Sequence, residues 1–258
     1  MGQNKAIDIT FDFRSDTPLG GDPDTLSPTL RRYHKLLWSK PLPSGALFLL
    51  DDTTRGLYLH HVSGLGEFRL ASDAVVPSFT REVRLVHIVN QIPREELDEF
   101  NHIGYTSGGM MLFPGNRVGR KMTINGARGF HPRIKDRFDL TVECIRRHYV
   151  DEPSPLSDTL ARYKDFFELF GDFRGYVDFF LLQDMVTEDY SAVRFFMPFE
   201  GFTGSPLPGS VDAYNAHRQF AIEFIEARNR RIDAADAALG GRPSVLWLRS
   251  SPTYSGGS

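Results

Sequence analysis

The sequence predicts an α+β fold, in which a mainly antiparallel sheet in the N-terminal half is packed by amphipathic helices of the C-terminal half. Two observations support this prediction. Between residues 46 and 124 short apolar runs are separated by glycine and proline, as strands commonly are. From residue 134 to 237 apolar residues instead recur at the 3.6-residue spacing of helices. The chain has 258 residues, of which 41% are hydrophobic, so we expect a single domain over residues 1–258.

The first two elements follow from turn and capping signals. Residues 15–28 are rich in Gly, Pro, Asp and Ser, which predicts a surface loop. A helix should then run from 28 to about 39, because Ser27 can accept a hydrogen bond from the first turn. Pro28 fits the first helical position, where its missing N–H is not needed.

Short apolar segments predict the strands, which are expected at 46–51, 56–61, 66–72, 83–89, 109–113, 120–124 and 190–199. The first two flank the turn-like sequence Asp-Thr-Thr-Arg, so we expect them to form a hairpin. The segment 172–186 is apolar on nearly every face. It is therefore expected to be buried, whether it is a helix or a strand.

Helical periodicity predicts amphipathic helices over 134–149, 154–170 and 210–237. Ser154 and Ser210 are the expected N-caps of the second and third. The C-terminal residues 250–258 are small and polar, and we expect them to fray.

Bulk composition excludes several classes of protein. A formal net charge of −3 gives no electrostatic basis for wholesale binding of nucleic acid. Cys144 is the one cysteine, so no intramolecular disulfide or thiolate metal cluster can form, which favours a reducing compartment. The chain has no signal-peptide pattern and no apolar run of membrane-spanning length. We expect a soluble, cytoplasmic protein without a membrane partner.

Strong catalytic motifs are missing, and the sequence identifies no cofactor and no metal-ligand spacing. The clearest candidate site is the stretch NGARGFHPRIKDR at residues 125–137. It belongs to a segment, 117–147, that holds nine Arg or Lys against three acids. We expect a glycine-rich loop that binds an anionic small molecule, such as a nucleotide or a phosphorylated metabolite. The expected ligand-binding residues are Asn125, Gly126, Arg128, Gly129 and Arg137, with Arg31 and Lys35 from the first helix.

Arginine suits this task because its planar guanidinium can bind two oxygens at once. Arg137 would also stand near a helix N-terminus, where a cation opposes the helix dipole unless an acid or anion compensates it. His131 is the expected acid or base if chemistry occurs, because its pKa lies near neutrality. His34 and His148 are further candidates.

Intramolecular charge pairing is the structural alternative for these arginines. Residues 151–200 hold eleven acids against four Arg or Lys and could face the basic segment. Two classes of function therefore stay open: an enzyme or nucleotide-handling protein, and a non-catalytic binding or interaction module.

A second charge pair is expected in the interior. Arg228 lies among apolar residues of the last predicted helix, so we expect it to be buried and paired with a carboxylate. Asp184, on the apolar arc of segment 172–186, is the first candidate partner.

Six segments resemble an uncharacterised bacterial family, a domain of unknown function: DFRSDTP, LRRYHKLLWSKPLPSG, TINGARGF, DRFDLTVECIRRHY, YVDFFLLQD and FIEARNRRI. The resemblance extends over nearly the whole chain except the C-terminal tail, and so implies one intact domain. It implies no activity, ligand or catalytic residue, and it leaves the oligomeric state open.

Overall fold

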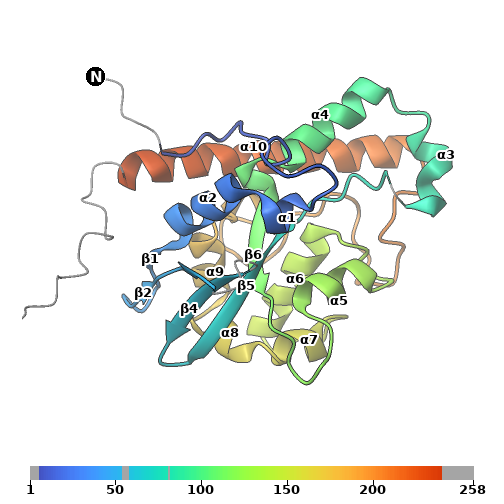
Figure 1. Ribbon diagram of the computed structural model, residues 1–258. Helices are drawn as coiled ribbons and strands as arrows, with labels where there is room; N and C mark the ends of the chain where they lie inside the picture. The colour runs from blue at the N-terminus through green and yellow to red at the C-terminus, as the bar shows by residue number, and fades with distance from the viewer. Residues whose placement is uncertain (1–5, 54–57, 81, 240–258) are drawn as a thin grey trace, which may run out of the picture.

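The computed structural model describes residues 6–53, 58–80 and 82–239. A four-stranded antiparallel sheet lies in the N-terminal half, with its strands in chain order (Figure 1). These strands are β3 Asp51–Asp52, β4 Leu59–Ser63, β5 Gly66–Ala74 and β6 Met110–Pro114. A separate two-stranded pair is formed by β1 Lys40–Pro41 and β2 Leu47–Phe48.

Helices cover this sheet and make up most of the C-terminal half. They are α1 Pro23–Leu26, α2 Pro28–Trp38, α3 Val86–Val89, α4 Arg94–Gly104, α5 Ile124–Phe130, α6 Phe138–Tyr149, α7 Ser157–Ala161, α8 Lys164–Glu168, α9 Phe173–Phe179 and α10 Val211–Leu239. Short 3-10 turns are η1 Val83–Leu85, η2 Ser107–Gly109 and η3 Gln183–Met185. Helix α10 spans the molecule and packs on α2, α4 and η2, while α5, α6 and α7 form a group of their own (Figure 1). The α+β prediction is confirmed.

Local capping signals placed two helices correctly. Helix α2 begins at Pro28, and the Ser27 side chain accepts a hydrogen bond from the Leu30 N–H at 3.1 Å. Helix α10 begins at Val211, after Ser210 Oγ accepts from the Ala213 N–H at 3.1 Å.

The predicted hairpin is confirmed only next to its turn, where β3 and β4 are antiparallel neighbours; Leu47 and Phe48 of the first predicted strand pair with β1 instead. The predicted turn between them falls partly outside the described residues, as does the predicted tail 250–258. The loop expected over 15–28 contains the short helix α1. The expectation of one domain over residues 1–258 stays a prediction.

Three predicted strands are wrong. Residues 83–89 form η1 and α3, whose apolar side chains pack in a small cluster around Tyr214. In 120–124 the chain is irregular until Ile124 starts α5, because Thr123 caps that helix. Residues 190–199 contribute only an isolated bridge, Val186 to Val193. These runs are only partly buried, with Val83 and Met122 exposed, and a short apolar run by itself does not distinguish a helix from a strand.

The predicted loop over 125–137 is wrong in its first half, where α5 extends to Phe130. Helix α6 accordingly begins at Phe138 instead of 134. Ser154 caps no helix, since α7 starts at Ser157 with Leu156 in the cap position.

Arg228 of α10 is fully buried, as predicted, but its predicted pairing with Asp184 is wrong. Its guanidinium donates to backbone carbonyl oxygens instead. Nη1 bonds Gly108 O at 2.9 Å and Met110 O at 2.8 Å, and Nε bonds Phe180 O at 3.2 Å. Burial lowers the pKa of Arg228 to about 10, so the group stays charged at neutral pH. Asp184 pairs with Arg231, one helical turn further along and partly exposed.

These carbonyl bonds predict a large stability effect. Replacing Arg228 with Met should lower the free energy of unfolding by about 3 kcal/mol, because it leaves several buried carbonyl oxygens without a donor. Arg231→Met removes a partly exposed ion pair on the same helix and should cost about 1 kcal/mol or less. Urea denaturation of both variants measures the difference. Equal costs would contradict the central role given to Arg228.

Candidate functional site

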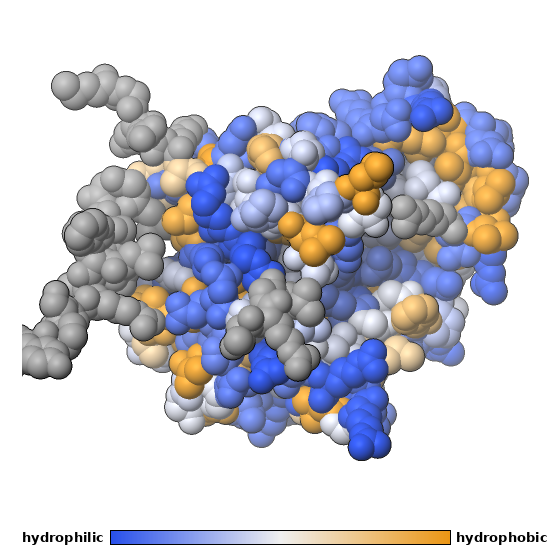
Figure 2. All heavy atoms as spheres, in the orientation of Figure 1, coloured by the Kyte–Doolittle hydropathy of each residue, from blue (hydrophilic) through white to orange (hydrophobic). Residues whose placement is uncertain are grey.

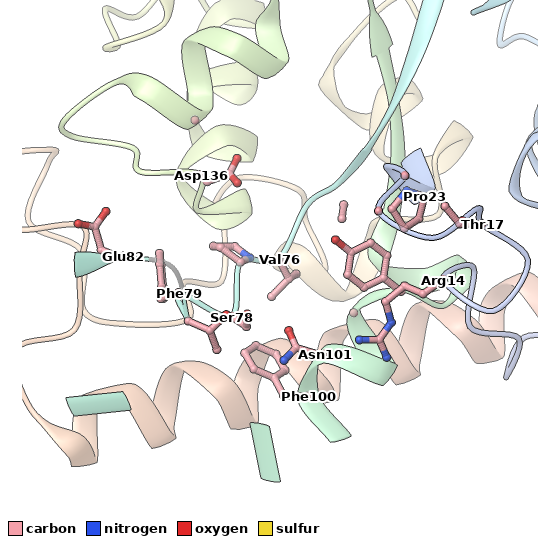
Figure 3. Close-up of a pocket in the computed structure, with 18 of the residues that line it drawn as sticks. Arg14, Thr17, Pro23, Val76, Ser78, Phe79, Glu82, Phe100, Asn101 and Asp136 are labelled. Atoms are coloured by element: carbon pink, nitrogen blue, oxygen red, sulfur yellow. Dashed lines mark hydrogen bonds between the residues drawn. The ribbon is translucent and has the colours of Figure 1, made fainter. Parts of the chain in front are cut away.

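A cleft of about 760 Å³ opens on one face of the molecule, where the space-filling view shows a hollow (Figure 2). It lies between the loop before α1, the chain that follows β5, the C-terminal part of α4 and the turn after α5. Arg14 stands on one side of it and Glu82 and Asp136 on the other, with Ser78 and Asn101 between them (Figure 3).

Arg14 supplies positive charge to its side of the cleft. Its Nε and Nη2 atoms donate to the Asp12 carboxylate at 2.9 and 2.5 Å. The guanidinium also lies 5.2 Å from the centre of the Tyr105 ring. The remaining nitrogen, Nη1, donates to no residue of the described chain. Arg14 is thus held in place while one donor group stays available to a ligand.

Two carboxylates stand on the opposite side. Lys135 and Asp136 have positive φ angles of 47° and 67°, so the chain makes a tight left-handed turn here. That turn directs both side chains to the cleft. Lys135 Nζ lies 3.3 Å from the Glu82 carboxylate, so this side of the cleft carries a cation beside its two acids.

Phe79 marks a strained backbone at the cleft wall. Its φ of 57° lies in the left-handed region, which aromatic residues rarely adopt. Helix α10 stabilises this conformation. The Tyr214 hydroxyl donates to Ser78 O at 2.6 Å, and the His217 ring packs 5.1 Å from the Phe79 ring. Such strain costs roughly 1–3 kcal/mol and tends to occur at functional sites.

Arg128 lies behind the cleft and is fully buried. Its Nη1 atom contacts Asp73 at 2.7 Å and Asp136 at 2.6 Å. Its Nη2 atom donates to Val75 O and to Asp136 O, and Nε donates to Thr141. All three guanidinium nitrogens therefore have protein partners, and Arg128 supports the cleft without opening onto it.

Asp24 of α1 extends this cluster. Its Oδ2 atom accepts from the Ala74 N–H at 3.0 Å, while the buried Oδ1 atom has no partner in the described chain. Burial, reinforced by the nearby charge of Asp73, raises the pKa of Asp24 to about 8. Burial also raises the pKa of Asp73 to about 7, although Arg128 opposes the shift. Neutral pH therefore lies inside the titration range of this pair.

Arg137 is likewise buried, at 2% exposure, and is the residue that precedes helix α6. It pairs with Asp139, whose side chain is fully buried and also accepts from the Phe196 N–H at 2.9 Å. Asp139 is in the first turn of α6, so it compensates the cation that the helix dipole disfavours. Arg137 lines a second cavity, of about 160 Å³, on the other side of this segment.

Arg128 and Arg137 form intramolecular ion pairs, but not with the acidic segment 151–200 that the structural alternative named. Arg128 and Arg137 pair with Asp73, Asp136 and Asp139, and none of these acids belongs to 151–200.

Asn125, Gly126 and Gly129 belong to α5 and not to a loop. Gly129 lines the cleft, and Asn125 donates to Ser72 O at 3.4 Å. The Gly126 N–H donates to the capping Thr123 hydroxyl. The structure therefore brings Asn125, Arg128 and Gly129 to one region but gives the glycines no role in shaping a loop.

His34 of α2 contacts Ser72 of strand β5. Its Nδ1 atom accepts from the Trp38 indole N–H at 3.0 Å, which leaves the proton on Nε2, 2.9 Å from Ser72 Oγ. Burial, with the charges of Arg228 and Arg31, lowers the pKa of His34 to about 3. A neutral His34 that donates to Ser72 cannot also accept its proton, so this arrangement is not that of a serine nucleophile and its base.

The other candidates lie apart. His131 Nδ1 accepts from the Arg133 N–H at 3.2 Å, and His131 lines neither cavity. His148 packs 5.1 Å from the Phe167 ring, and burial lowers its pKa. Lys35 pairs with Asp52 at 2.5 Å on the surface of α2. Arg31 shares that acid and lines a small cavity of about 20 Å³ next to His34.

Sequence reasoning missed Arg14, Asp24, Asp73 and Phe79. Arg14 directly precedes the turn-rich segment 15–28 and Asp24 lies within it, and that segment predicts only a loop. Asp73 ends a strand, and nothing local shows that it meets Arg128, which is 55 residues away in the sequence. The positive φ of Phe79 has no signal in its residue type.

Arg128 gives a test of the buried cluster. Arg128→Met should lower the free energy of unfolding by about 3 kcal/mol or more, because it leaves two carboxylates without their shared cation. Lys121→Met removes an exposed cation from the same basic segment and should change stability by about 0.5 kcal/mol or less. Denaturant unfolding of both variants checks this. An unchanged free energy of unfolding in Arg128→Met would mean that the guanidinium is not needed for folding.

Asp24 gives a pH-dependent test. Its pKa is 3.8 as a free side chain and about 8 in the fold, so the folded protein holds a proton that the unfolded chain has released between these values. The free energy of unfolding should therefore fall as pH rises through this interval, by about 1.4 kcal/mol per pH unit at most.

Asp24→Asn fixes the neutral form and should remove this dependence. Relative to the wild type, the variant should gain stability as the pH rises from about 4 to about 8, and the difference should level off above pH 8. Urea denaturation across that range measures the difference. A constant difference between the two proteins would show that Asp24 titrates normally.

Comparison with known proteins adds a family but no function. Within the described part of the chain, no three His, Cys, Asp or Glu side chains are placed to hold one metal ion. Of the helices described, none combines the length and apolar character that a membrane span requires. No curated protein and no solved structure matches the sequence. A family model described as "Family of unknown function (DUF6994)" matches residues 7–232, and the chain therefore belongs to this family of unknown function.

Proposed function

We propose that the cleft binds a nucleotide or another phosphorylated small molecule. The observation that carries this proposal is the charge arrangement of the cleft, with the Arg14 guanidinium on one side and two carboxylates beside Lys135 on the other. A nucleotide has matching groups. Its phosphate needs cationic donors, and its ribose hydroxyls and base amino groups need acceptors.

Size and wall chemistry fit such a ligand. A volume of about 760 Å³ lies in the range of small-molecule sites, roughly 300–1,000 Å³. Phe79, Phe100 and Val76 provide apolar surface for a base or sugar ring. Between them, Ser78 and Asn101 supply neutral polar groups.

Arg14 is the proposed phosphate ligand, because Nη1 is the guanidinium nitrogen that Asp12 leaves unused. Glu82 and Asp136 are the proposed acceptors for hydroxyl or amino groups. Arg128, which the sequence suggested as a direct ligand, has all its guanidinium nitrogens bonded by the protein, and Arg137 does not line this cleft. In this proposal Arg128 does not contact the ligand and instead positions Asp136 at the cleft wall.

The alternative of a binding module without catalysis has its own support. The nitrogen atoms of Arg128 are all engaged by the protein, and His131 lines neither cavity. We therefore propose ligand binding and assign no reaction. Cytoplasmic location stays a prediction from the lone cysteine, and a bacterial origin stays a prediction from the family resemblance.

Titration calorimetry with nucleoside monophosphates, their nucleosides and inorganic phosphate tests the proposal. At least one nucleotide should bind about tenfold or more tightly than its nucleoside, because the phosphate adds charge-assisted hydrogen bonds to Arg14. Arg14→Met should remove that advantage and leave nucleoside binding unchanged. Glu82→Gln should weaken the nucleotide and its nucleoside alike.

Arg94→Met is the matched control, because Arg94 is an exposed arginine of α4 whose recorded partner is Asp98 on the same helix. It should bind like the wild type. If no phosphorylated compound in the panel binds, or if Arg14→Met and Arg94→Met behave alike, the cleft does not serve this class of ligand.

A further inference from the structure

The segment that follows α5 separates two cavities. Lys135 and Asp136 line the cleft, whereas Arg133 and Arg137 line the second cavity, of about 160 Å³. The far wall of this second cavity comes from the chain before α10, with Phe199, Glu200 and Phe202 among its residues. Nothing in the proposed function uses these side chains.

Arg137 makes this cavity unusual, because a guanidinium at 2% exposure forms part of its wall. Asp139 occupies Nε and Nη2 of Arg137. The third nitrogen, Nη1, has a single long contact, 3.4 Å to Pro206 O. A buried donor with so weak a partner can bind an oxygen of a ligand.

Arg133 adds a second cation at the mouth of the cavity. Its Nη1 atom donates to Phe202 O at 3.2 Å, which fixes the side chain against the far wall. Its Nε and Nη2 atoms donate to no residue of the described chain. Two arginines with unused donors thus converge on one small space, which suits a carboxylate.

Glu200 brings the opposite charge to the same cavity. Its carboxylate forms no ion pair with a described residue, and it would repel a simple anion held by the two arginines. Asp139 already compensates the charge of Arg137, so Arg133 and Glu200 are the two lining charges left to a ligand. A ligand that carries both a carboxylate and an ammonium group complements them. The rings of Phe199 and Phe202, 4.9 Å apart and nearly perpendicular, supply an apolar surface for a short side chain.

We propose that this cavity binds a small amino acid as its zwitterion. Arg133 and Arg137 bind the carboxylate, Glu200 binds the ammonium group, and the two phenylalanine rings contact the side chain. The volume equals that of about five water molecules, which matches the size of a ligand of about five or six non-hydrogen atoms.

Calorimetry and saturation-transfer NMR on the full chain test the proposal with glycine and alanine as probes. Acetate and methylamine, each of which carries only one of the two charges, are the comparison compounds at constant ionic strength. Glycine or alanine should bind about tenfold or more tightly than either. Arg133→Gln and Glu200→Gln should each weaken binding of the amino acid about tenfold, whereas only Arg133→Gln should weaken acetate.

Arg117→Gln is the matched control, because it makes the same charge change at an exposed arginine outside the cavity. Arg14→Met should also leave amino-acid binding unchanged, which separates this site from the cleft. Arg137 itself is not replaced, since loss of its pair with Asp139 would destabilise the fold. Equal binding of acetate and the amino acid by the wild type, or an unchanged preference for the amino acid in Glu200→Gln, would overturn the zwitterion assignment. Equal effects of Arg133→Gln and Arg117→Gln would overturn the site.

Discussion

The buried guanidinium of Arg228 is the interaction on which the rest of the fold depends. A charge so far from water is stable only if its donors find acceptors, and here carbonyl oxygens of η2, β6 and the end of α9 supply them. One side chain of α10 thereby joins the sheet to the helical half. Asn229 extends this junction, because its side chain accepts from the Gly108 N–H at 2.7 Å and donates to Thr106. Gly108 is required there, since a Cβ atom would lie 2.3 Å from Ile225 O.

Three arginines of the described chain, Arg128, Arg137 and Arg228, are buried. Arg228 is held by neutral carbonyls, Arg137 by a buried carboxylate, and Arg128 by two carboxylates and two carbonyls. The different partners have different consequences. Carbonyls leave the full positive charge in the core, where it contributes to the low pKa of His34. The carboxylates around Arg128 instead exceed its charge, and protons on Asp24 and Asp73 can make up the difference near neutral pH.

Sequence reasoning succeeded where a feature depends on neighbours in the chain. Ser27 and Ser210 cap their helices because capping involves atoms only three residues away. Burial of Arg228 also followed from its own helix face. Its partners did not, because backbone carbonyls carry no signal in residue type, and the expected Asp184 lies one turn away beside Arg231. The cleft was missed for the same reason. Arg14 and Asp136 line the same cleft only because the loop before α1, the sheet and α5 pack together.

Side chains of residues 133–137 are divided between the two cavities, so this segment forms a wall of both. Residues 135 and 136 line one cavity and residues 133 and 137 the other, across a left-handed turn in which the Lys135 and Asp136 N–H groups donate to His131 O and Arg128 O. A ligand that displaces this turn from one side therefore also displaces residues that line the other cavity. Any resulting cooperativity between two ligands must be reciprocal, since each changes the affinity of its counterpart by the same factor. Residues 133–137 would then couple the binding affinities of the two cavities as well as separate them.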